Sequence, residues 1–181
     1  MIVLPSETLR RVRAGEIVST LEGLGRGVTE LIAYGSFEAD PGSVWSVLDD
    51  VEDYVNTMPK VKASELIERR EGGLRMRMVV ETPFPLPDIS STYESIHTTE
   101  EGVWRRQWKQ VDKGFAPNSG SWLLVPMPDS DTGTLAEYRV KMEPKIRIPK
   151  KVIHFAHNRV VPEVFRKVGH HALQRQGRRG S

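Results

Sequence analysis

The sequence predicts an α+β fold in which a curved antiparallel sheet of about seven strands wraps around a long C-terminal helix. Alternating, β-branched runs separated by turn residues fill residues 61–144. Two short helical patterns precede them after the first main strand, and apolar residues recur at helical spacing over residues 149–176. With 181 residues, of which 38% are hydrophobic and 28% charged, the chain has the size and composition of one globular domain.

We expect residues 1–27 to form an N-terminal extension packed on a domain that spans residues 28–176. Residues 6–13 are typical of a short helix capped by Ser6, and residues 16–22 of a short strand. Three glycines in residues 23–27 predict a hairpin turn, because no Lys-Ser or Lys-Thr pair follows to make a phosphate loop. A long strand over residues 28–39 comes next.

The stretch FEADPGSVWSVLDDVEDYVNTMPKV, residues 37–61, predicts two short helices that meet at a corner. Asp40 is placed to cap the first helix, and Pro41 occupies its first position, where the missing N–H costs nothing. Pro59 ends the second helix. We expect this corner to close one end of an internal cavity through the apolar residues Val44, Trp45, Val47 and Leu48.

Four acidic residues crowd the junction of these helices: Asp49, Asp50, Glu52 and Asp53. Paired carboxylates are compatible with a metal or acid–base site, but acids also gather at helix starts to match the helix dipole. No histidine lies near them in sequence, so we expect no metal here and no cofactor elsewhere in the chain.

Three hairpins are expected downstream, over residues 61–82, 89–112 and 119–144. In the first, Gly72 and Gly73 mark the turn, and the second arm alternates between an apolar and a charged face. Its inward residues are Leu74, Met76, Met78 and Val80, and its outward residues are Arg75, Arg77 and Glu81. The proline-rich residues 83–88 form a rigid loop that exposes Phe84 and Leu86 at its tip.

The last segment changes to a helical period. Its apolar stripe predicts one long helix over residues 149–176, with a kink or break after Val161 because Pro162 cannot continue the backbone ladder. Residues 141–181 contain eleven Lys and Arg against two Glu, a net charge of +9 in a chain of net charge +2. This basic segment either complements an acidic body or makes transient contact with a membrane surface. Nucleic acid is the less favoured partner, and residues 177–181 are expected to be a basic disordered tail.

Composition excludes several classes of protein. The chain has no cysteine, so disulfides and thiolate chemistry are absent. It contains no apolar run long enough to span a bilayer, and its N-terminus lacks the pattern of a signal peptide. We therefore expect a cytoplasmic protein.

Two motifs carry a resemblance to the START-like superfamily, the polyketide cyclase/dehydrase and lipid-transport proteins, whose fold is the helix grip. The first is the corner stretch, which resembles a family pattern of the form V-W-x-v-l-x-D-x-e-x-Y-x-x-x-M-P-x-V from Val44 to Val61. The second is Gly120, Ser121, Trp122, Leu124 and Pro126, which resembles a G-S-W-x-l-x-P strand. The resemblance covers residues 28 to 175. Many relatives have an arginine just after the proline-rich loop, where this chain has Ile89.

In a helix-grip fold the sheet and the C-terminal helix enclose a cavity, so the resemblance implies a hydrophobic ligand such as a lipid, an isoprenoid quinone or a polyketide. Strand alternation and helical spacing select the side chains that would face it. The predicted ligand-binding residues are Met76, Met78, Tyr93, Trp104, Trp108, Trp122, Tyr138, Val140, Val160, Val161, Val164 and Val168. The alternative is that these aromatic and methionine residues fill the core and leave no space.

A catalytic function would need groups that move protons. Tyr93 and His97 share one face of a strand, and Arg106 lies between Trp104 and Trp108 on another, so these three are the catalytic candidates for a cyclase-type reaction. A histidine near a strand end is more often solvated. His154 and His157 stand three residues apart on the C-terminal helix, but no third metal ligand accompanies them.

Three functions remain open. A binding or transfer protein for an apolar ligand, our preferred interpretation, needs only the cavity and a gate. An aromatase/cyclase needs the polar trio inside the cavity. An interaction protein would use the basic C-terminal segment on a membrane, an RNA or the ribosome.

Overall fold

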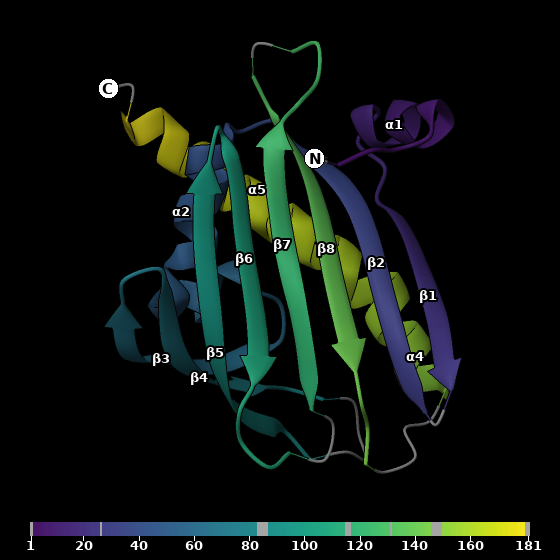
Figure 1. The fold of residues 1–181 in the computed structure, drawn as a ribbon, viewed down its shortest axis with the longest axis vertical. Helices are drawn as coiled ribbons and strands as arrows, with labels where there is room; N and C mark the ends of the chain where they lie inside the picture. The colour runs from purple at the N-terminus through teal and green to yellow at the C-terminus, as the bar shows by residue number, and fades with distance from the viewer. Residues whose placement is uncertain are drawn as a thin grey trace.

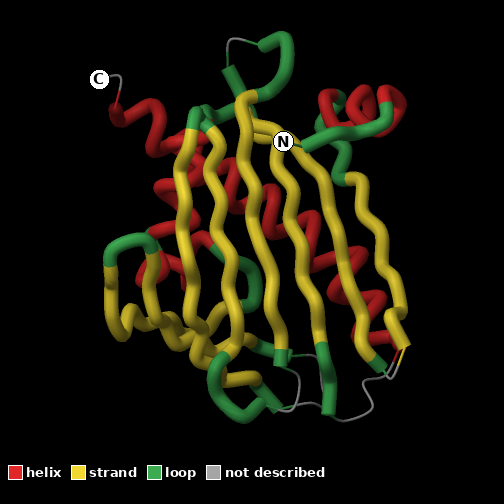
Figure 2. The backbone as a smooth tube through the Cα atoms, viewed as in Figure 1, coloured by secondary structure: helices red, strands yellow, loops and turns green. Residues whose placement is uncertain are grey.

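The structure is a computed structural model that describes residues 2–25, 27–82, 87–114, 117–130, 132–145 and 150–179. Its centre is one antiparallel sheet with the strand order β1-β2-β8-β7-β6-β5-β4-β3. A long helix, α5, lies diagonally across one face of this sheet, and β3 and β4 bend round at one edge (Figures 1 and 2). This arrangement confirms the predicted α+β helix-grip fold.

The described residues form eight strands. They are β1 (Val18–Gly25), β2 (Val28–Phe37), β3 (Val61–Arg70), β4 (Gly73–Val80), β5 (Ile89–Glu100), β6 (Val103–Gln110), β7 (Asn118–Pro126) and β8 (Thr134–Met142). The helical segments are α1 (Ser6–Arg13), α2 (Pro41–Asp49), the 3₁₀ turn η1 (Val51–Asp53), α3 (Tyr54–Thr57), α4 (Lys150–Phe155), the π-helical turn η2 (Ala156–Val160) and α5 (Val161–Arg179).

The N-terminal region differs from the prediction in two details. β1 pairs with β2 along its length and continues to Gly25, so the sheet gains a full strand and the turn expected over residues 23–27 is shorter. Helix α1 has Pro5 at its N-cap and no side-chain cap, so Ser6 is its first helical residue and not its cap. α1 is held instead by the buried Val12, whose carbonyl accepts a hydrogen bond from Ser36 Oγ.

The corner after β2 forms as expected. The Asp40 carboxylate accepts hydrogen bonds from Ser43 N at 2.9 Å and Ser43 Oγ at 2.6 Å, which caps α2. Val44, Val47 and Leu48 are fully buried, and α2 packs on α5. Along β4 the predicted alternation also holds in its first part, because Leu74 and Met76 are buried while Arg75 is partly exposed and Arg77 is exposed. The predicted exposure of Phe84 and Leu86 falls outside the described residues.

The break in the C-terminal helix lies before the proline. Residues 156–160 form a π-helical turn, and Pro162 is the second residue of α5. A proline has no N–H to donate to the preceding turn and its ring crowds that turn, which explains a wider turn there. α5 then continues to Arg179, so residues 177–179 are helical and not part of a disordered tail.

Part of the basic C-terminal charge is used inside the molecule. Arg175 pairs with Asp50 at 2.8 Å and with Asp53 at 3.4 Å, and Lys167 donates a hydrogen bond to the Met58 carbonyl. Arg175 therefore pairs with two acidic residues at the junction of the two short helices. Contact of the remaining basic residues with a membrane stays a prediction. In the described part of the chain no helix has the length and apolar character needed to cross a bilayer.

Candidate ligand cavity

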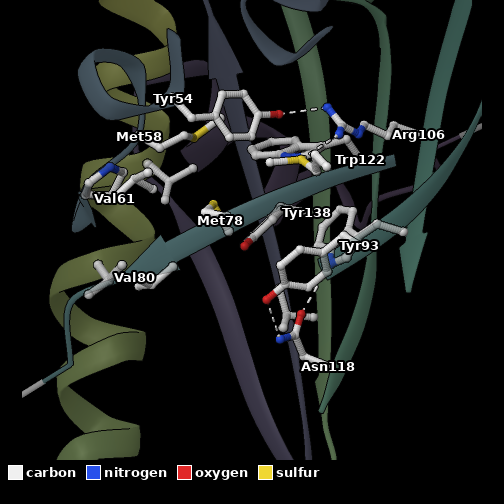
Figure 3. Close-up of a pocket in the computed structure, with 16 residues that line it drawn as sticks. Tyr54, Met58, Val61, Met78, Val80, Tyr93, Arg106, Asn118, Trp122 and Tyr138 are labelled. Atoms are coloured by element: carbon white, nitrogen blue, oxygen red, sulfur yellow. Dashed lines mark hydrogen bonds between the residues drawn. The ribbon is translucent and has the colours of Figure 1, made fainter. Parts of the chain in front are cut away.

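A cavity of about 220 Å³ lies between the sheet, the α3 corner and α5. Figure 3 shows its walls, which come from β3 to β8 on one side and from α3, η2 and α5 on the other. The lining residues are Tyr54, Met58, Pro59, Val61, Met76, Met78, Val80, Tyr93, Arg106, Trp108, Asn118, Trp122, Tyr138, Val140, Val160 and Val164. Most are apolar or aromatic, as in sites that bind organic molecules.

Nine of the twelve residues predicted from the sequence lie on this wall. They are Met76, Met78, Tyr93, Trp108, Trp122, Tyr138, Val140, Val160 and Val164. Trp104, Val161 and Val168 do not. Trp104 lies at the start of β6, with its ring centroid 5.4 Å from that of Trp45. The two valines belong to α5 and are buried in the packed core. Alternation assigns a residue to a face, but it does not say how far along the strand or helix the cavity extends.

Of the remaining lining residues, Arg106 was predicted as a catalytic candidate, and the others were not predicted as individual ligand-binding positions. Tyr54, Met58, Pro59 and Val61 come from the corner that was expected to close a cavity, so their region carried a signal although their side chains did not. Val80 had been placed on the inward face of its strand. Asn118, at the first position of β7, had no sequence signal.

Arg106 is a charged residue in a largely apolar cavity. Its side chain is buried at the end of the cavity, with 4% of the residue exposed. One guanidinium nitrogen, Nη1, donates hydrogen bonds to the Leu48 carbonyl and, at 2.7 Å, to the Tyr54 hydroxyl. The Tyr54 hydroxyl in turn donates to the same carbonyl at 2.5 Å. This triangle joins β6 to the end of α2, and Figure 3 shows its Arg106–Tyr54 edge.

A second polar group lies at the opposite side of the cavity. Asn118 Nδ2 donates a hydrogen bond to the Tyr93 hydroxyl at 3.0 Å, and Trp108 Nε1 donates to Asn118 Oδ1 at 3.4 Å. Burial raises the pKa of Tyr93, and also that of Tyr138, so both phenols are protonated at neutral pH. Tyr93 and Tyr138 are therefore neutral hydrogen-bonding groups.

The predicted trio of Tyr93, His97 and Arg106 does not converge on the cavity. His97 is outside the lining set, although it pairs directly with Arg106 across β5 and β6. Its side chain is only 12% exposed and its ring makes an edge contact with Trp45, so the expectation of a solvated histidine was wrong. His97 Nε2 shares a hydrogen bond with Ser95 Oγ at 3.0 Å, and Nδ1 lies 3.4 Å from Asp49 Oδ1. Burial, and then the charge of Arg106, lower the pKa of His97 to about 4.

The other candidate ligand clusters have structural partners. Asp49 pairs with Arg69 of β3 at 2.8 Å. His157 shares a hydrogen bond with Ser19 Oγ at 2.9 Å, which ties the π-helical turn to β1. These contacts give each group a role in holding elements together.

Comparisons with known proteins agree with this architecture. Residues 37–168 match the model of a family described as polyketide cyclase / dehydrase and lipid transport. No curated protein sequence matches the chain significantly.

Solved structures share the fold at low sequence identity. A STAR-related lipid transfer protein from Xanthomonas axonopodis is 20% identical, with a TM-score of 0.63 over 85% of this chain and 98% of that one. Human STARD10 is 14% identical, with a TM-score of 0.69 over 96% of this chain and 81% of its own. The ZhuI aromatase/cyclase from a Streptomyces species is 17% identical, with a TM-score of 0.61 over 85% and 96%. At these identities the likeness shows the fold alone.

Proposed function

The chain belongs to the polyketide cyclase / dehydrase and lipid transport family, and from this premise we propose that it binds and carries a small hydrophobic molecule in the cavity under α5. The observation that supports this most is the cavity itself. It is lined mainly by valine, methionine and aromatic side chains and lies where the sheet and the helix would otherwise pack together. A soluble protein keeps such apolar space when a ligand occupies it.

The size of the cavity limits the guest. An engineered apolar cavity of about 150 Å³ binds benzene, and this cavity is about 220 Å³. The space therefore suits a body of about two fused rings, or a short branched chain. A two-chain lipid would require α5 or the α3 corner to move.

A cyclase-type reaction is the second candidate, because two of the three catalytic candidates, Tyr93 and Arg106, do line the cavity. Against it, His97 is not among the residues that line the cavity, and a carrier needs no proton-transfer group. Turnover of a polyketide-like substrate that is lost in Tyr93→Phe, with binding retained, would favour the enzyme.

The binding proposal is tested by native mass spectrometry of protein purified from cells and by calorimetric titration with naphthalene. We expect saturable one-to-one binding that is abolished by Val164→Trp, which fills the cavity from α5. The control is Val55→Trp, since Val55 is 44% exposed on α3 and its replacement leaves the cavity open. Failure of naphthalene to bind the wild type, with nothing co-purifying, would refute the proposal.

A further inference from the structure

The cavity contains one ionised group at neutral pH. Among its sixteen lining residues Arg106 is the only one with a charge, because the rest are apolar or neutral polar side chains and no carboxylate is among them. A buried cation without a counter-ion is costly in an apolar environment. A guanidinium is not deprotonated in proteins, so such a charge has to be compensated by its surroundings.

The acidic residues of the α2–α3 junction pair with other arginines. Asp49 pairs with Arg69 at 2.8 Å, and Asp50 pairs with Arg175 at 2.8 Å. Neither carboxylate makes an ion pair with Arg106 in the described structure. The described hydrogen bonds of the Arg106 guanidinium are therefore all with neutral groups.

Those neutral groups compensate it only in part. The Leu48 carbonyl belongs to the last turn of α2, where the helix dipole provides a partial negative charge. The Tyr54 hydroxyl accepts one further hydrogen bond. Both contacts are made by Nη1, whereas the one contact of Nη2 that the structure describes is with the Met76 thioether sulfur, at 3.6 Å. A thioether is a weak acceptor, so Nη2 retains capacity for an oxygen ligand.

A second donor points into the same space. The Tyr138 hydroxyl projects toward the centre of the cavity near Met78 (Figure 3), and within the described residues it has no hydrogen-bond partner. The Tyr138 ring packs against Trp122, with ring centroids 4.5 Å apart and the planes tilted by 36°. One wall of the cavity thus presents a cationic and a neutral donor to the guest.

We infer that the natural guest is an organic anion, a compact apolar body with one carboxylate or enolate group that is bound by Arg106. This inference rests on the proposed binding function and specifies the chemical class of its ligand. An anionic oxygen would complete the Nη2 contacts with charge-assisted hydrogen bonds, and the apolar body would lie against the valine and methionine wall. A neutral hydrocarbon would fill the same volume and leave the charge uncompensated.

The test compares three probes that share the naphthalene ring system: naphthalene, 2-naphthamide and 2-naphthoate. The last two have planar head groups of similar size, of which the amide is neutral and the acid is ionised at pH 7. We expect calorimetry to show at least about tenfold tighter binding of the naphthoate than of the naphthamide, since a hydrogen bond to a charged group is strong when buried. In Arg106→Met this preference disappears, while the affinity for naphthalene changes by less than about threefold.

Arg105→Met is the matched control, because Arg105 is exposed on the other face of β6 and its loss changes the net charge equally. It should keep the preference. Arg106→Lys serves as a second variant that retains the charge if Arg106→Met does not fold. Equal affinities of the wild type for both head groups, or a preference that persists in Arg106→Met, would overturn the inference while naphthalene binding still upholds the binding function. A wild type that binds none of the three probes overturns both.

Discussion

Helix α5 crosses two different environments on the same face of the sheet. Around Val168 the helix is in close contact with the strands, and around Val164, one turn earlier, it borders the cavity. The close contact depends on small residues. A Cβ on Gly35 would lie 2.5 Å from the Phe165 ring, and one on Gly169 would lie 3.1 Å from the Phe37 ring. The helix and sheet can approach there because these positions lack side chains.

The hollow part has large side chains instead. Trp108, Tyr138 and Trp122 form a row across three strands, with ring centroids 5.9 Å and 4.5 Å apart. Trp122 and Tyr138 also contact the Phe165 ring of α5, at centroid distances of 5.3 Å and 6.5 Å, so this row of rings borders both the cavity and the packed core. Arg106 closes the end of that row. On this face of the sheet, glycines allow close packing along one part of α5, and large side chains border the cavity along the other.

The largest expected effect compares Val168→Ala with Val164→Ala. The two valines lie one turn apart on α5, so helix propensity cancels, but Val168 is fully enclosed and Val164 faces the cavity. Removing the methyl groups of Val168 should lower the free energy of unfolding by about 2 kcal/mol. Removing those of Val164 should lower it by about 1 kcal/mol or less, because fewer packed contacts are lost beside the cavity. Urea denaturation at 25 °C measures both. Equal losses would mean that the cavity closes in solution.

Sequence periodicity predicted this division only in part. Alternation and the helical stripe gave the fold and the inward face, since both periods follow from backbone geometry. They placed Trp104, Val161 and Val168 on the correct face but could not show that these residues lie beyond the cavity, because the extent of the cavity depends on side-chain packing between the sheet and the helix. His97 was misjudged for a related reason. Its strand position suggested solvent, but Trp45 and Asp49 from α2 cover it, and that contact is set by tertiary packing.

The second expected effect concerns the pH dependence of stability at His97, and it tests whether water reaches this end of the sheet. The pKa of His97 is lowered to about 4, against 6.5 for a free histidine. Between these values the unfolded chain binds more protons than the folded one. The contribution of His97 is therefore fully present above about pH 6.5 and is lost as the pH falls toward 4. After allowance for its partial exposure we expect about 1–2 kcal/mol.

Urea denaturation of the wild type and of His97→Gln across pH 4–7 measures this contribution. Carboxylates titrate in both proteins, so the difference between the two curves isolates His97. Its neighbours Asp49, Arg106 and Arg69 are unchanged in the variant. Parallel curves would show that water reaches the imidazole and that this end of the sheet is wet.

The smallest effect on stability is expected where the effect on binding is largest. In Arg106→Met the Leu48 carbonyl keeps its hydrogen bond from the Tyr54 hydroxyl, so neither group is left without a partner. Replacing a buried, partly compensated charge by an apolar side chain of similar length is often neutral or stabilising. We expect the free energy of unfolding in urea to stay within about 1 kcal/mol of the wild type or to rise. A loss of several kcal/mol would mean that Arg106 holds β6 to α2 as a structural residue. An unchanged or higher stability would mean that Arg106 is not needed for folding. That result is expected if the charge is kept for ligand binding rather than for stability.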